Sequence, residues 1–187
     1  MSEQPVSEVV VRGVMERLFA DPALSTYVIL DGASVPDLLG KLEEHAPEHV
    51  CLYRGELAPD LAECAPYLVR LTSESPFTHW VVEEGWGKHW GIFALAASDL
   101  ERMRRHFRTF LMVQSPEGKR LYFRYYDPRV LREYLPTCNE EETRAVFGPV
   151  GCYLCEGGST SGLHSFRQEQ GSLRLESLNL SRDTRLS

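Results

Sequence analysis

The sequence predicts an α/β fold: a mixed sheet flanked by helices, with a short β-rich C-terminal appendage. Tyr27-Val-Ile-Leu30 is a continuous apolar run, which is typical of a strand buried on both faces. A helical pattern and a second short apolar run at Val50–Tyr53 follow it, and this order indicates a right-handed βαβ unit with parallel strands. Short alternating stretches occupy Cys152–Leu180. The length of 187 residues suits one α/β domain over 1–150, followed by the appendage and tail over 151–187.

The first half of the chain alternates between helical and extended patterns. Apolar residues recur at helical spacing over Glu8–Ala20 and predict the first helix. Ser34, with Pro36 shortly after it, is expected to cap the helix between the first two strands. The patterns that follow predict a strand at Tyr67–Leu71, a helix over Phe77–Glu84 and a strand at Gly91–Leu95.

Capping residues and turn residues define the second half. Ser98 and Glu101 form a capping box for a long helix, and Asn139 suits the cap of a helix over Glu140–Phe147. Two hairpins are predicted, one joining Met112–Gln114 to Leu121–Tyr125 around Pro116-Glu-Gly118, and one that turns near Gly171, with a loose tail at Ser181–Ser187.

The stretch Leu121–Pro136 is the most informative part of the chain. Aromatic residues favour a strand over Phe123–Asp127, and Asp127 then suits a helix N-cap with Pro128 at the first helical position. Arginine and tyrosine are residue types that carry much of the binding energy of protein interfaces. The predicted partner-binding residues of this stretch are Arg124, Tyr126, Asp127, Arg129 and Tyr134. In the alternative interpretation Asp127 caps the helix while the arginines pair with local carboxylates, and the two interpretations are compatible.

Three tryptophans lie close together in a region interrupted by glycines. Trp90 leads into an apolar strand, so we expect it to be buried. Trp86 lies between Gly85 and Gly87, which predicts a loop, and it is the better candidate for an exposed interface residue. Burial of Trp86 as a core residue is the alternative.

The charge and the apolar pattern exclude several classes of function. A formal charge of −7 argues against general nucleic-acid binding, which needs a basic surface. No apolar run approaches the roughly 20 residues that span a bilayer. Residues 1–7 lack the basic and apolar regions of a signal peptide, so we expect a cytoplasmic protein with no membrane association.

The sequence offers little for metal binding or catalysis. Cys152 and Cys155 form a lone Cys-x-x-Cys pair, whereas a structural zinc site needs four ligands. Thr160, not a serine, stands at the centre of Gly158-Ser-Thr-Ser-Gly162, so this segment is not a nucleophile elbow. We therefore expect no metal, no cofactor and no catalytic residues.

Several local patterns, taken in order, resemble one known family, the type VI secretion system effector adaptors (chaperones), long catalogued as a domain of unknown function. The resemblance extends from about Tyr27 to Val150. Its most specific part is Arg124-Tyr-Tyr-Asp-Pro-Arg-Val130. The other patterns are Tyr27-Val-Ile-Leu-Asp-Gly32, Leu52-Tyr-Arg-Gly55, Ala65-Pro-Tyr-Leu-Val69, Trp90-Gly91, Arg104–Leu111 and Phe147-Gly-Pro149.

The resemblance implies a cytoplasmic protein that is not an enzyme. Members of the family bind a secreted effector and help to load it onto the spike protein VgrG, so both proteins are the implied partners. Many members carry a longer, largely helical C-terminal lobe, which does not match the short segment after Pro149 in this sequence.

Two other functions remain open at this point. An immunity-type protein would bind and neutralise a toxin directly, and an acidic protein suits a basic toxin. A small hydrolase would use histidine and aspartate residues around the tryptophan-rich loop, although no nucleophile and base have a recognisable spacing.

Overall fold

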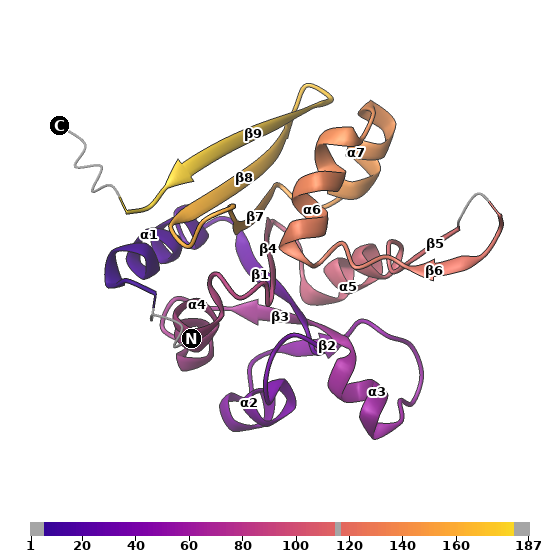
Figure 1. The fold of residues 1–187 in the computed structure, drawn as a ribbon, viewed down its shortest axis with the longest axis horizontal. Coiled ribbons are helices and arrows are strands. Elements are labelled where there is room, and N and C mark those ends of the chain that lie inside the picture. Colours follow the sequence, from indigo (N-terminus) through magenta and orange to yellow (C-terminus); the bar gives the residue numbers. More distant parts are fainter. Residues whose placement is uncertain (1–5, 115–116, 182–187) are drawn as a thin grey trace.

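The computed structural model describes residues 6–114 and 117–181. Within these residues the chain forms seven α-helices, a seven-stranded sheet and a separate two-stranded sheet (Figure 1). The helices are α1 (Glu8–Leu18), α2 (Leu38–His45), α3 (Pro59–Cys64), α4 (Pro76–Gly85), α5 (Leu100–Arg108), α6 (Pro128–Tyr134) and α7 (Glu140–Phe147), and a short 3-10 turn (Leu135–Thr137) follows α6. The strands are β1 (Ser25–Asp31), β2 (His49–Cys51), β3 (Pro66–Leu71), β4 (Gly91–Ala96), β5 (Met112–Gln114), β6 (Arg120–Tyr122), β7 (Cys152–Glu156), β8 (Gly162–Glu169) and β9 (Ser172–Asn179).

The large sheet has the strand order β2-β3-β1-β4-β7-β8-β9. The predicted α/β class is confirmed, but every pairing between neighbouring strands is antiparallel. The sheet is therefore antiparallel and not mixed as predicted, although the first two strands do run in the same direction, as expected. Strand β3 lies between β1 and β2 and runs antiparallel to both, so the two never meet.

Helices cover both faces of the sheet. Helices α1, α2 and α4 pack on one face, where Val14, Leu38 and Phe77 join the core. Helices α5, α6 and α7 pack on the other face, where Phe107 and Phe147 are buried. Both faces of β1 are therefore covered, and this explains its continuous apolar sequence, as predicted.

The C-terminal segment is β-rich, as predicted, and it continues the large sheet. Strand β7 pairs with β4, and the hairpin of β8 and β9 extends the sheet beyond β7. Gln170 and Gly171 have φ of 51° and 88° and form the two-residue turn of this hairpin, which confirms the turn near Gly171. The predicted tail lies, from residue 182 onward, outside the described residues.

Two predicted helix caps differ from the structure. Helix α2 begins after Asp37, and the hydroxyl of Ser34 instead donates to the carboxylate of Asp31. Helix α5 is capped by Asp99, which accepts the backbone N–H of Arg102 at 2.7 Å, and not by Ser98. At α5 the carboxylate of Asp99 is a stronger acceptor than a serine hydroxyl, whereas Asp37 at the start of α2 makes no side-chain cap. The capping box at Asn139 is confirmed.

The segment before α6 is a turn and not the predicted strand. Strand β6 ends at Tyr122, and the backbone N–H of Asp127 donates to the carbonyl of Arg124 at 3.0 Å. The reason is tertiary: the hydroxyl of Tyr125 reaches the carbonyl of Phe107 inside the core, which draws the chain out of an extended path. The hairpin of β5 and β6 forms as predicted, with a shorter second strand, and Pro116 lies outside the described residues.

Candidate functional site

The turn before α6 meets the end of β1, and five residues there form what we call the junction site: Asp31, Arg124, Tyr126, Asp127 and Arg129. Arg124 donates a hydrogen bond from Nη2 to Oδ2 of Asp31, which also accepts the hydroxyl of Ser34 at 2.9 Å. The side chain of Asp31 is 2% exposed and that of Arg124 is 46% exposed. The buried carboxylate thus fixes one edge of a guanidinium whose other edge faces solvent.

A second arginine is held in the same manner at the start of α6. Oδ1 of Asp127 accepts the backbone N–H of Arg129 at 2.9 Å and its Nε–H at 3.0 Å, and Oδ2 accepts Nη2 at 2.6 Å. The predicted N-cap is therefore confirmed. The alternative that the arginines pair with carboxylates is also confirmed, although the carboxylate that pairs with Arg124 is distant in sequence.

The electrostatics of the site follow from this arrangement. Burial raises the pKa of Asp127, but the hydrogen bonds and the charge of Arg129 outweigh this effect and hold the pKa below its usual value. Partial burial lowers the pKa of Arg124, while the hydrogen bond and charge of Asp31 more than compensate and raise it. The carboxylates are inside and the cations outside, so the surface presents guanidinium N–H groups suited to carboxylate or carbonyl acceptors.

The two tyrosines of the prediction have different positions. Tyr126 is 3% exposed, and burial and the nearby phenol of Tyr53 raise its pKa. It is thus a buried support for the surface, and the prediction that it offers a contact surface is wrong. Tyr134 is half-buried and packs edge-on against Phe123, with ring centroids 4.8 Å apart.

The hairpin of β5 and β6, which we call the apolar arm, extends away from the body of the molecule (Figure 1). Its pairs are Met112 with Tyr122 and Val113 with Leu121, and all four side chains are exposed. Because successive side chains of a strand point to opposite faces, the arm presents apolar groups on both faces. Exposed apolar side chains gathered on one hairpin make the arm a candidate for contact with a partner.

The apolar arm is connected to the junction site through two tyrosines. The ring centroids of Tyr122 and Tyr53 lie 5.4 Å apart, and Tyr53 is near enough to Tyr126 of the junction site for the two phenols to shift each other's pKa. Arg108 on α5 fixes the segment before Tyr53 by donating to the carbonyls of Cys51 and Leu52, and it also donates to the carbonyl of Tyr53 at 2.8 Å. Tyr53 therefore lies between the apolar arm and the buried side of the junction site.

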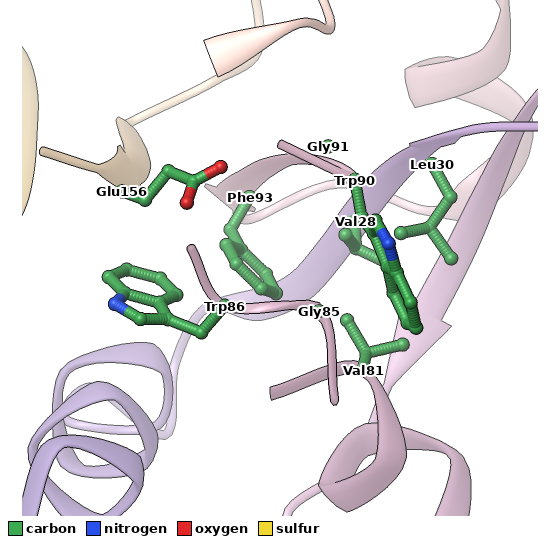
Figure 2. A pocket seen from close by; sticks show the side chains of 9 residues that line it. All are labelled: Val28, Leu30, Val81, Gly85, Trp86, Trp90, Gly91, Phe93 and Glu156. Atoms are coloured by element: carbon green, nitrogen blue, oxygen red, sulfur yellow. The ribbon is translucent and has the colours of Figure 1, made fainter. Parts of the chain in front are cut away.

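Trp86 is buried, so the prediction that it is exposed is wrong and the alternative, burial as a core residue, is confirmed. It is 4% exposed, its ring stacks on Phe93, and its Nε1–H donates to the carbonyl of Thr160 at 3.1 Å. Trp90 is buried, as predicted. These aromatic rings line a cavity of about 10 Å³ (Figure 2). Because a single water needs roughly that volume, the cavity is too small for a larger ligand.

A further charged pair at the same end of the sheet was not predicted from the sequence. Nδ1 of His89 lies 2.8 Å from Oε1 of Glu156, whose side chain is 5% exposed. Burial raises the pKa of Glu156, and the charge of His89 offsets this in part. Arg132 on α6 donates to the carbonyls of Glu156 and Gly157 at 2.7 and 2.5 Å, which joins α6 to the end of β7.

The Cys-x-x-Cys pair has no geometry for chelation. Cys152 packs in the core on one face of β7 and Cys155 in the core on the other face. Burial raises the pKa of Cys155 to about 12, so its thiol stays protonated at neutral pH. Among the residues that the structure describes, no group of three His, Cys, Asp or Glu side chains could hold a metal ion. In the same part of the chain no helix is long and apolar enough to cross a bilayer.

The carboxylate of Asp127 should make stability depend on pH. Asp127→Ala removes the N-cap and the partner of Arg129, so we expect a loss of about 1–2 kcal/mol at neutral pH. Since the folded pKa lies below the unfolded value, this contribution is complete above about pH 4 and disappears as the pH falls through the folded pKa. Urea unfolding of the wild type and of Asp127→Ala at several pH values measures the difference in their free energies of unfolding. Asp127→Asn keeps the N-cap and should therefore lose less stability than Asp127→Ala. If the stability difference between the wild type and Asp127→Ala did not change with pH, the contribution of the Asp127 carboxylate would be contradicted.

The fold and the site define a small α/β protein with an antiparallel sheet and two arginines held in place by carboxylates. The chain belongs to the family described as Domain of unknown function (DUF4123), which matches residues 26–145. The matched region begins in β1 and ends in α7, and it contains the whole junction site and the apolar arm. Comparisons with curated proteins and with solved structures gave no match.

Proposed function

We propose that this protein is a non-enzymatic adaptor (chaperone) of a type VI secretion system, which binds a secreted effector and helps to load it onto the spike protein VgrG. The proposal combines the family membership with the resemblance of the sequence motifs to effector adaptors. One observation carries it: residues 124–130, the most specific of these motifs, form the junction site and present two fixed arginines to solvent. In this proposal the protein works in the bacterial cytoplasm.

The mechanism is binding alone. Arg124 and Arg129 are held by Asp31 and Asp127, so an acceptor on the effector meets guanidinium groups that are already oriented. The apolar arm supplies the non-polar contact beside them. Burial of such side chains around a few fixed arginines and tyrosines is the usual arrangement of an interface hot spot.

The experiment that tests the proposal is a tagged pull-down from the native host, analysed by mass spectrometry. Recovery of an effector together with VgrG is the expected result. Recovery of a toxin without VgrG would replace the adaptor by an immunity-type protein. Recovery of neither from folded protein would overturn the proposal.

Surface variants in the same pull-down should connect the function to the site. Arg129→Gln, and separately Leu121→Ser with Tyr122→Ser, are expected to reduce effector capture about ten-fold or more, because each removes a hot-spot contact. Arg12→Gln is the matched control, since Arg12 is also an exposed arginine, with 62% of its side chain accessible, and it lies on α1. Circular dichroism checks that each variant is folded. Equal capture by all variants would exclude this surface as the effector site.

A further inference from the structure

We propose that two copies of this protein pair through strand β9, antiparallel and centred on Leu175, to give a symmetric dimer with a continuous sheet. The inference concerns a part of the molecule that the proposed adaptor function does not use. It rests on the free edge of β9, the direction of its backbone groups and the order of its side chains.

Strand β9 is a long edge of the large sheet. It spans eight residues, Ser172–Asn179, and among the described strands it pairs only with β8. The opposite edge, β2, has three residues. No other described strand lies against the outer side of β9 (Figure 1). A long edge strand with unpaired N–H and C=O groups is a template for another strand, and most proteins shorten or cover such edges.

The turn determines which backbone groups of β9 face outward. The two-residue turn at Gln170 and Gly171 makes Glu169 and Ser172 a hydrogen-bonded pair, and the pattern then alternates along the strand. Even-numbered residues therefore bond to β8, in agreement with the backbone N–H of Leu180, which donates to the carbonyl of Ser161 at 2.8 Å. The outward groups belong to Leu173, Leu175 and Ser177.

The side chains of β9 are self-complementary in one register. When Leu175 lies opposite Leu175 of the second copy, Arg174 lies opposite Glu176 of that copy, and the same pair recurs across the two-fold axis. Opposite charges and apolar pairs at directly facing positions stabilise antiparallel strands. Centring the pairing on Arg174 or on Glu176 would still use the outward backbone groups, but it would place like charges directly opposite each other, which is destabilising.

Leu175 and Arg174 are exposed in a single copy and would be covered by a second copy in the proposed dimer. Leu173 and Leu175 lie on the same face of β9. Leu173 packs against the core, whereas Leu175 is 46% exposed. The side chain of Arg174 is 70% exposed, with a distant contact of 3.8 Å to Glu169. A second copy would cover Leu175 and give Arg174 a directly facing carboxylate, and an isologous contact of this kind closes into a dimer.

Sedimentation equilibrium of the full chain, from micromolar to millimolar concentration, tests the proposal. The wild-type protein should form dimers, and Arg174→Glu or Glu176→Arg alone should weaken dimerisation about ten-fold or more because like charges then face each other. The double variant Arg174→Glu with Glu176→Arg should restore the dimer, since the facing pairs are again opposite in charge. Glu83→Gln is the control: Glu83 is an exposed carboxylate on α4, with 55% of its side chain accessible, and the substitution should leave the dimer unchanged.

Two results would overturn the proposal. One is a wild-type protein that stays monomeric over the whole range. The other is a dimer that neither single reversal weakens, or that the double reversal does not restore. If the free protein is monomeric and the single reversals instead reduce effector capture, then β9 pairs with the effector and not with a second copy. This outcome would leave the adaptor function intact.

Discussion

The Gly91→Ala variant is expected to lose roughly 3 kcal/mol or more of folding free energy, because an added methyl group would collide with backbone atoms in the centre of the sheet. A Cβ built on Gly91 would lie 2.0 Å from the carbonyl oxygen of Ile29 and 2.9 Å from its carbon. These atoms belong to the central strand β1, so no side-chain rotation can relieve the contact. Either β4 or β1 must move, although both are covered on both faces.

Thermal unfolding followed by circular dichroism measures the effect. For a protein of this size the expected loss lowers the midpoint by roughly 6–12 °C. Gly158→Ala is the matched control: it lies in the loop after β7, and an added Cβ would meet no atom within 4 Å. Its stability should stay within about 0.5 kcal/mol of the wild type. Equal effects of the two substitutions would show that the close approach at Gly91 is absent in solution.

The second large effect is expected at the ion pair of the junction site. Arg124→Ala should cost about 1–3 kcal/mol, because it removes the charged partner of a carboxylate that is almost completely buried. This value lies below that of a fully buried pair, since the arginine side chain is half exposed and water screens it. Ser34 and the backbone N–H of Ala33 continue to donate to Asp31.

A double-mutant cycle separates this charge effect from lost packing. In the presence of Asp31→Asn, the substitution Arg124→Ala should cost clearly less than in the wild type, because no buried charge is left without a partner. Chemical denaturation of the four proteins gives the coupling. Arg129→Ala is a useful comparison, since Asp127 keeps its hydrogen bond to the backbone N–H of residue 129. Additive effects at positions 31 and 124 would rule out the proposed pairing.

The elements with strong apolar patterns were predicted well because burial determines them. Strands β1, β3 and β4 and helix α4 agree with their predictions to within one or two residues. Helix α3 was not predicted, and none of its residues is buried, so it has no apolar period to detect. The pairing order of the strands was also missed. A strand–helix–strand sequence does not reveal that a later strand, β3, returns to lie between the first two.

In the candidate site, too, contacts between residues close in sequence could be predicted, whereas contacts between residues far apart in sequence could not. The capping role of Asp127 and its pairing with Arg129 could be predicted because they depend on residues two positions apart. Asp31 was missed because its partner Arg124 lies 93 positions away, although Asp31 belongs to one of the motifs of the family resemblance. The error at Trp86 has the same cause. Its neighbouring glycines indicate a loop, but Thr160, 74 positions later, covers the indole.

The position of β7 has a consequence for how the chain must be synthesised and assembled. Strand β4 receives its second neighbour only when β7 has been made, and 56 positions separate Ala96 from Cys152. Until then the nascent chain leaving the ribosome has β4 as an open edge with an apolar face on each side. The segment that matches the family ends before this strand, so that segment released alone would carry the unprotected edge. The segment from β7 onward thus covers the edge of β4, and every experiment above should use a chain that contains it.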